Sequence, residues 1–202
     1  MADSTDHHDG CGCGSGYDGG QREASLHSAS RRRFLAGAAA GAAMLVPWGR
    51  AAAALETRSL AFSHNHTGER LQVVYFEGGE YLPDAVAEIN HLLRDFRTGE
   101  VWEMDLELLD TLAELRAMTG SRAEFQVISG YRSPKTNEML RNSSSGVAKR
   151  SLHMQGRAID IRLSGYDTAK LRKAALSLGR GGVGYYARSD FIHVDTGRVR
   201  TW

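Results

Sequence analysis

Residues 151–160 read Ser-Leu-His-Met-Gln-Gly-Arg-Ala-Ile-Asp, and residues 190–193 read Asp-Phe-Ile-His. Asp160 and His193 each lie between two β-branched apolar residues, an alternation that is typical of strands with one buried face. If these two strands pair antiparallel, the side chains of Asp160 and His193 converge, and His153 reaches the same point from the preceding loop. The two segments therefore predict a two-stranded unit that gathers two imidazoles and a carboxylate.

Two imidazoles and one carboxylate are the ligand set of a catalytic zinc ion, whose fourth position stays open for water. Taken alone, each histidine is more often a surface residue or a hydrogen-bonded one than a ligand. Their combined spacing, with Gly156 allowing a turn between the first two, favours ligation of Zn2+ by His153, Asp160 and His193. The sequence therefore predicts a zinc hydrolase.

A zinc hydrolase also needs a base for the water and donors for the developing oxyanion. Asp190, three residues ahead of His193, is the predicted base, and the alternative is that it serves only as a turn residue. Arg132 follows a predicted strand and offers a planar fork to a carbonyl or carboxylate, and the alternative is a surface ion pair. Asp195, on the same strand face as His193, is placed either to orient that imidazole or to play no part.

Hydrophobic periodicity divides the rest of the chain into helices and strands. Apolar residues at helical spacing predict helices, and runs rich in β-branched and aromatic residues predict strands. The predicted helices cover 83–96, 105–118, 134–140 and 166–178, and the predicted strands cover 71–76, 125–128, 158–163, 181–186 and 191–194. Together they predict an α+β domain with a small, mostly antiparallel sheet, flanking helices and the zinc site on the sheet face.

The N-terminal part of the chain differs in composition from the rest. Residues 1–29 are mostly Gly, Ser, His and Asp and are predicted to be a disordered tail. Residues 30–54 begin Ser-Arg-Arg-Arg-Phe-Leu and continue into a short Ala- and Gly-rich run, the pattern of a twin-arginine signal peptide. The alternatives are an uncleaved anchor or a chance basic cluster.

The apolar run is shorter than the roughly 20 residues of a membrane-spanning helix, so no stable membrane span is expected in the mature form. The sequence thus predicts export by the twin-arginine route to the periplasm, with residues 55–202 as the functional domain. The net charge of +1 argues against a nucleic-acid-binding protein, which would be strongly basic. The two cysteines, Cys11 and Cys13, both lie in the predicted tail, so the folded domain is expected to have no disulfide.

Three motifs taken together resemble one known group of enzymes. They are S-G-Y-R-S-P at 129–134 with Thr-Asn at 136–137, S-x-H-x-x-G-x-A-x-D at 151–160, and D-F-I-H-V-D-T-G-x-V-R-x-W at 190–202. From about Leu60 to Trp202, the chain resembles the D-Ala-D-Ala carboxypeptidase and dipeptidase superfamily of zinc peptidases, in the branch of murein endopeptidase K. The resemblance implies a peptidoglycan endopeptidase that hydrolyses cross-links between stem peptides in the periplasm.

The resemblance also carries residue roles onto matching positions. The zinc ligands of the family match His153, Asp160 and His193, the acidic base matches Asp190, and the substrate or oxyanion arginine matches Arg132. Many members of the wider superfamily have a histidine two residues before the final ligand, where this chain has Phe191. That departure leaves Asp190 as the one base expected nearby.

Two other functions stay open at this point. A D,D-carboxypeptidase or dipeptidase would trim free stem ends, and a capped pocket with a buried cation near 142–150 would favour it. A non-catalytic cell-wall binding module would keep the metal for stability alone, because ligands by themselves do not establish catalysis.

Overall fold

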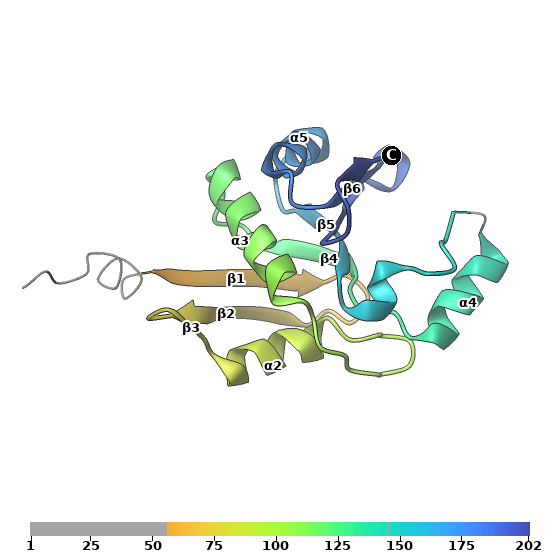
Figure 1. The fold of residues 1–202 in the computed structure, drawn as a ribbon, viewed down its shortest axis with the longest axis horizontal. Helices are drawn as coiled ribbons and strands as arrows, with labels where there is room; N and C mark the ends of the chain where they lie inside the picture. The colour runs from red at the N-terminus through yellow and green to blue at the C-terminus, as the bar shows by residue number, and fades with distance from the viewer. Residues whose placement is uncertain (1–55, 145) are drawn as a thin grey trace, which may run out of the picture. The chain divides into compact units, whose positions relative to one another are not determined.

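An eight-stranded sheet runs through the part of the chain that the computed structural model describes, residues 56–144 and 146–202 (Figure 1). The strands are β1 (Thr57–His64), β2 (Arg70–Glu77), β3 (Glu80–Tyr81), β4 (Phe125–Ser129), β5 (Ala158–Leu163), β6 (Gly182–Tyr186), β7 (Phe191–Asp195) and β8 (Arg200–Thr201). Their order across the sheet is β3-β2-β1-β4-β5-β7-β6-β8. The β1–β4 and β6–β8 pairs are parallel, and the other neighbours are antiparallel.

The fold is α+β with a mostly antiparallel sheet, as predicted, but the expectation of a small sheet was wrong. The difference comes mainly from β1, in which polar residues obscure the strand pattern. Leu60 and Phe62 of β1 are nevertheless fully buried, and His64 is only 1% exposed. Strands β3 and β8, at the two edges of the sheet, have two residues each and are too short to show a periodic pattern in the sequence.

Four helices flank the sheet in the described residues: α2 (Pro83–Leu92), α3 (Leu106–Thr119), α4 (Pro134–Ser143) and α5 (Thr168–Leu178). Each corresponds to a predicted helix, with shifts at the ends. Helix α2 ends at Leu92, before the predicted end at residue 96. The carbonyl of the next residue, Leu93, accepts a hydrogen bond from the Tyr131 N–H at 2.8 Å. Within residues 56–144 and 146–202, no helix is both long and apolar enough to cross a membrane.

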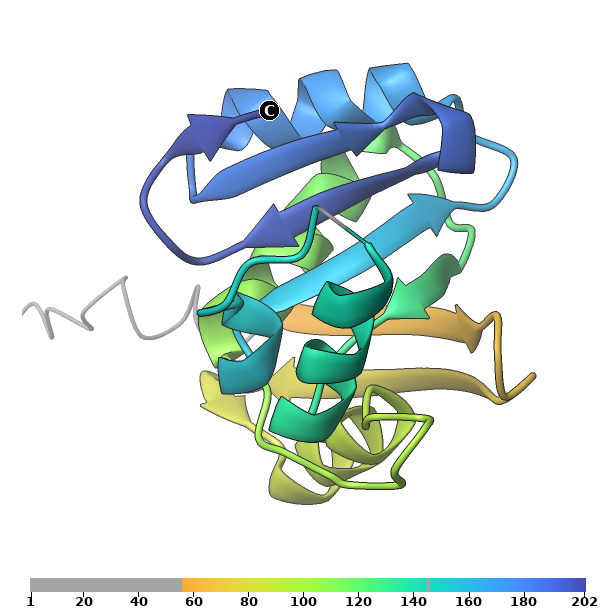
Figure 2. The ribbon, with the colours of Figure 1, turned by 90° about the vertical axis from the view of Figure 1, so that its right-hand side faces the viewer.

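The two faces of the sheet are covered by different elements. Figure 2 shows α4 and the short helix η1 (Leu152–Gln155) in front of the sheet, and α3 and α5 behind it. The isoleucines of β5 belong to the buried core together with Leu171 of α5. Because strand side chains alternate between faces, Asp160 is directed away from that core and toward the side of α4 and η1.

The predicted pairing of the two site strands is confirmed. β5 and β7 are antiparallel neighbours, and Asp160 lies directly opposite His193 in their register. The predicted tail (1–29) and the predicted signal peptide (30–54) lie outside the described residues.

Candidate metal centre and active site

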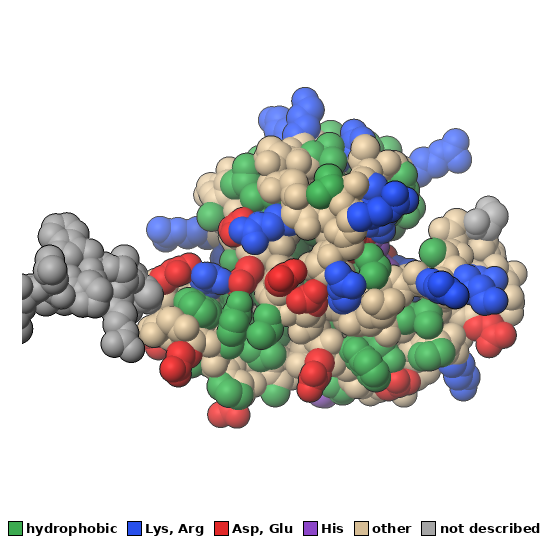
Figure 3. Space-filling view, in the orientation of Figure 1, with side chains coloured by type: hydrophobic (Ala, Val, Ile, Leu, Met, Phe, Trp, Pro, Cys, Tyr) green, Lys and Arg blue, Asp and Glu red, His purple; other side chains and the backbone are tan. Residues whose placement is uncertain are grey.

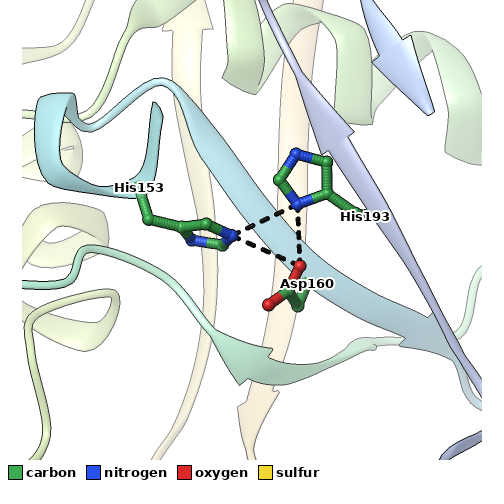
Figure 4. Close-up of side chains that lie close together, drawn as sticks. All are labelled: His153, Asp160 and His193. Carbon is green, nitrogen blue, oxygen red and sulfur yellow. Dashed lines mark hydrogen bonds and ion pairs between the residues drawn. The ribbon is translucent and has the colours of Figure 1, made fainter. Parts of the chain in front are cut away.

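The three predicted ligands come together in one buried group (Figure 4). His153 comes from η1, Asp160 from β5 and His193 from β7, and one ligand atom from each lies within 4.8 Å of the others. The Asp160 Oδ1 atom is 2.9 Å from His193 Nδ1 and 3.3 Å from His153 Nε2, and the two ring nitrogens are 3.2 Å apart. All three residues are at most 8% exposed.

The outer nitrogens of the two imidazoles fix which nitrogen faces the group. His153 Nδ1 donates to the Gly130 carbonyl at 2.7 Å, and His193 Nε2 donates to Asp195 Oδ2 at 2.9 Å. These partners can only accept, so the inner nitrogens, Nε2 of His153 and Nδ1 of His193, present lone pairs to Asp160. Two lone pairs and a carboxylate oxygen repel one another unless a cation lies among them. The donor set therefore fits a metal ion that takes nitrogen and oxygen ligands.

The pKa values of the three residues also indicate a place for a positive charge in the group. Burial lowers the pKa of His153, which favours the neutral, metal-binding imidazole. Burial alone would raise the pKa of Asp160, but His153, His193 and Arg132 outweigh it and hold that pKa well below its usual range. Burial likewise opposes a charge on His193, yet its hydrogen bonds to Asp160 and Asp195 raise its pKa. A proton on His193 thus takes the electrostatic place that a metal cation would fill.

The turn between His153 and Asp160 depends on a glycine. Gly156 has a left-handed backbone with φ of +68°, and a Cβ there would lie 2.0 Å from the Glu103 carbonyl oxygen. No other residue fits both conditions. The role expected for Gly156 is confirmed.

Arg132 is close to the ligand group, as its predicted role requires. Its Nη2 forms a short ion pair with Asp160 Oδ2, and its Nε donates to Ser129 Oγ at 2.8 Å. Among the described residues, no hydrogen bond involves Nη1. The guanidinium is therefore anchored at two nitrogens and keeps one for the cavity that it lines.

Asp95 holds the residue after Arg132 in place through hydrogen bonds, a role that the sequence analysis did not predict. It is 1% exposed and accepts hydrogen bonds from the Ser133 N–H at 2.9 Å and the Ser133 hydroxyl at 2.6 Å. Burial alone would raise the pKa of Asp95, but the hydrogen bonds from Ser133, Thr136 and the backbone lower it to about 2. The signal in the sequence was an acidic residue among the apolar positions at the end of a predicted helix, next to Phe96.

A cavity of about 600 Å³ opens beside the ligand group. All three ligands line it, and so do Arg132, Arg150, Arg200, Tyr186, Phe191 and Trp202. Among the described lining residues, Asp160 is the only carboxylate. A substrate in this cavity would meet the ligand group, several cations and an aromatic wall.

Comparison with known proteins shows which family the chain resembles over most of its length. A family model described as Peptidoglycan L,D-endopeptidase MepK matches residues 52–202. The Peptidoglycan L,D-endopeptidases MepK of Escherichia coli and Shigella flexneri are each 45% identical to this chain over 180 residues, covering 86% of it and 97% of their own length. A Haemophilus influenzae relative is 46% identical over 146 residues, covering 72% of this chain and 78% of its own. The chain belongs to the MepK family.

Membership in the MepK family confirms the resemblance seen in the motifs, because this is a family of metallopeptidases that act on peptidoglycan. The match spans the whole of the described sheet and every residue of the ligand group. The ligand group, its cavity and Arg132 therefore lie within the region that the family model matches.

The structure does not bring Asp190 to the ligand group. Asp190 Oδ1 accepts a hydrogen bond from Thr168 Oγ1 at 2.6 Å, and Oδ2 lies 3.3 Å from Arg162. Its side chain is 61% exposed, and it is not among the residues that line the cavity. Asp190 lies just before β7 in a left-handed backbone, with φ of 51°, so the alternation of the strand does not carry its side chain to the face of His193.

Asp195 contacts the predicted ligand His193 on the side of the ring opposite Asp160. It is 1% exposed, and it also accepts hydrogen bonds from Arg200 and from the backbone N–H groups of Gly182 and Gly197. Burial alone would raise the pKa of Asp195, but His193 and Arg200 hold it below its usual range. The orienting role that the sequence left open is thus the one that fits the contacts.

If the three residues bind a metal ion, changing Asp195 to asparagine is expected to weaken that binding by about 10- to 100-fold, the range typical of partners that orient a metal ligand. The amide keeps the shape but loses the charge that supports the His193 imidazole. Competition with a chelating dye measures the affinity, with Asp167→Asn at the start of α5 as the matched control. Equal zinc affinities for wild type and Asp195→Asn would contradict the orienting role.

Proposed function

We propose that this chain is a zinc-dependent peptidoglycan endopeptidase that hydrolyses peptide cross-links between stem peptides. The observation that carries the proposal is the convergence of His153, Asp160 and His193 in a buried group whose donor atoms suit a metal ion, inside a MepK-family fold. The relatives' name specifies a bond between an L- and a D-configured centre, and we extend that bond type to this chain.

The proposed roles follow from the contacts. His153, Asp160 and His193 would hold the zinc ion, which when bound supplies the Lewis acidity that activates water and polarises a carbonyl. Arg132, anchored on Asp160 and Ser129, directs its remaining nitrogen toward the carbonyl oxygen of the scissile amide. The Gly130 carbonyl and Asp195 keep the two imidazoles in the orientation that binding requires.

Asp190 is the part of the sequence-based scheme that the contacts favour least. As a base it would have to leave Thr168 and Arg162 and turn into the cavity. Its left-handed backbone, with φ of 51°, suits Asp or Asn at a tight corner. We propose that Asp190 holds the corner between β6 and β7.

Replacing Asp190 by asparagine is therefore expected to keep the turnover rate within about tenfold of wild type, because asparagine tolerates the same backbone. A proton-transfer role would instead cost about 10²- to 10⁴-fold. Steady-state rates on a cross-linked peptide, with thermal melting as a check on folding, separate the two. A hundredfold loss of rate with normal melting would restore Asp190 as the base.

The cations around the cavity favour an endopeptidase over a carboxypeptidase. A pocket that recognises a chain end is expected to be capped and to present the terminal carboxylate with a buried cation that has no carboxylate partner of its own. Arg132 and Arg200 are already paired with Asp160 and Asp195, and Arg150, which also lines the cavity, is exposed rather than buried. The described lining therefore offers no capped site for a free stem end.

The test is a digest of purified muropeptide dimers, followed by mass spectrometry. Release of monomers would establish the endopeptidase, and the monomer masses would identify the bond. Loss of single D-alanine residues from intact dimers would identify the carboxypeptidase. Binding to sacculi without any product would identify a non-catalytic wall module.

We also propose that the protein acts in the periplasm and is exported by the twin-arginine route. The proposal rests on the Ser-Arg-Arg-Arg-Phe-Leu pattern at 30–35 and on the peptidoglycan substrate of the relatives. Replacing Arg31 and Arg32 by lysine is expected to keep the protein in the cytoplasm, as measured by cell fractionation. Undiminished periplasmic protein would exclude this route.

A further inference from the structure

An aromatic shelf forms one wall of the cavity beside the ligand group. It consists of Tyr186, Phe191 and Trp202, all of which line the cavity. The rings of Tyr186 and Phe191 are stacked with centroids 4.5 Å apart, and the indole Nε1 of Trp202 donates to the Tyr186 hydroxyl at 3.1 Å. Tyr186 and Trp202 nevertheless remain 37% and 47% exposed. Large aromatic surfaces left open inside a cavity are typical of ligand contacts.

Several contacts hold Trp202 in this place. Its carbonyl accepts a hydrogen bond from the Tyr185 N–H at 3.0 Å, and the Arg200 guanidinium lies 4.8 Å from its ring centroid. The ring is also 5.2 Å from the ring of the ligand His193, centroid to centroid. The indole is thus fixed relative to the ligand group while about half of the residue stays open.

Strand β6 makes room for this ring. A Cβ on Gly184 would lie 2.7 to 2.8 Å from three indole atoms of Trp202, so any side chain there would displace the ring. Gly184 is also the residue that lies opposite His193 in the β6–β7 register. The absence of a side chain at this one position therefore lets the indole lie next to a metal ligand.

We propose that the aromatic shelf binds an aliphatic peptide residue that flanks the scissile bond, with Trp202 as the main contact. This inference rests on the proposed function. A group stacked on Trp202 lies within one residue of an amide held at the ligand group, because the two rings are only 5.2 Å apart. That proximity favours the peptide rather than the more distant glycan strand as the occupant. Trp202 would accordingly be a specificity-determining residue that contacts substrate.

The test compares Trp202→Ala with Trp102→Ala in the zinc-loaded protein. Trp102 is a matched control because it is 48% exposed and stacked on Tyr131 at 5.5 Å, yet does not line the cavity. A third variant, Gly184→Ala, keeps the indole but is expected to displace it. Calorimetry gives the Kd of a glycan-free cross-linked peptide whose scissile amide is replaced by a bond that resists hydrolysis, and mass spectrometry records the cleavage of the unmodified peptide.

We expect Trp202→Ala and Gly184→Ala to raise the Kd about tenfold or more, the lower end of what a hydrophobic subsite contact contributes, and Trp102→Ala to leave it unchanged. Zinc content and melting temperature should stay within the wild-type range, which a purely structural role for Trp202 would not allow. Trp202→Phe should recover most of the affinity. Equal Kd values for Trp202→Ala and wild type, or a loss seen only with glycan-bearing substrate, would overturn the proposal.

The two claims fail separately. Wild-type protein that binds the peptide through Trp202 without cleaving it would overturn the proposed function and keep the aromatic shelf. Cleavage that is unaffected by Trp202→Ala would overturn the shelf and keep the function. Wild-type protein that neither binds nor cleaves the peptide would overturn both.

Discussion

Replacing Asp160 by alanine is expected to abolish zinc binding and peptidoglycan cleavage together. Asp160 supplies the one carboxylate among the described lining residues, and its Oδ1 faces both ligand imidazoles. Partners that merely orient a ligand contribute about 10- to 100-fold to metal affinity, so losing a charged ligand should cost more than that. Isothermal titration with zinc and a muropeptide digest measure the two losses on the same sample.

The Asp160→Ala variant also leaves the Arg132 guanidinium without a partner. The Arg132 side chain is 14% exposed and would lose its carboxylate partner, which is strongly destabilising for a buried ion pair. Asp160→Asn separates this effect from ligation, because the amide keeps a hydrogen-bond acceptor for Arg132 but not the ligand charge. Full activity with normal zinc content in either variant would refute the assignment of Asp160 as a ligand.

Replacing Arg132 by glutamine is expected to lower the turnover rate by about 10²- to 10³-fold while zinc stays bound, the loss seen when one oxyanion donor is removed. The guanidinium is the cavity-lining cation nearest to the ligand group, and two of its nitrogens are already anchored. Arg132→Lys should recover only part of the rate, because an ammonium lacks the planar fork.

The control for Arg132 is Arg162→Gln. Arg162 is on β5 like the ligand Asp160, but its guanidinium contacts Gln126 and Asp190 away from the cavity. The expected pattern is a fall in kcat for Arg132→Gln alone. A fall of similar size in both variants would indicate a general loss of folding instead of a missing donor.

The site was more predictable than the sheet around it. Asp160 and His193 each stand between β-branched residues, and that alternation fixes the strand face on which they lie. The β5–β7 register then placed the two side chains opposite each other, as expected. His153 followed because Gly156 permits the one sharp turn that its position requires.

The features that the sequence did not predict, strand β1 and the role of Asp95, also have specific physical causes. Strand β1 was not predicted because Ser63 and His64 break its apolar pattern, and because one of its two partner strands, β4, is distant in sequence. The role of Asp95 was not predicted because its hydrogen-bond partner Ser133 is 38 residues away in the sequence. Such contacts depend on tertiary structure, which local periodicity does not encode.

Asp190 shows the limit of counting residues along a strand. Its distance of three positions from His193 suggested proximity, but Asp190 lies before the first residue of β7, in a left-handed backbone that turns its side chain away. The hydrogen bonds to Thr168 and Arg162 then hold it at the corner of the sheet.

The most direct test of the central claim is a zinc titration of the chelated protein, read out as hydrolysis of a cross-linked muropeptide dimer. If His153, Asp160 and His193 hold the catalytic ion, activity is absent after chelation and returns in full at one equivalent of zinc. Asp160→Asn should stay inactive across the same titration. Hydrolysis that persists after complete removal of metal, or that Asp160→Asn retains, would contradict the account.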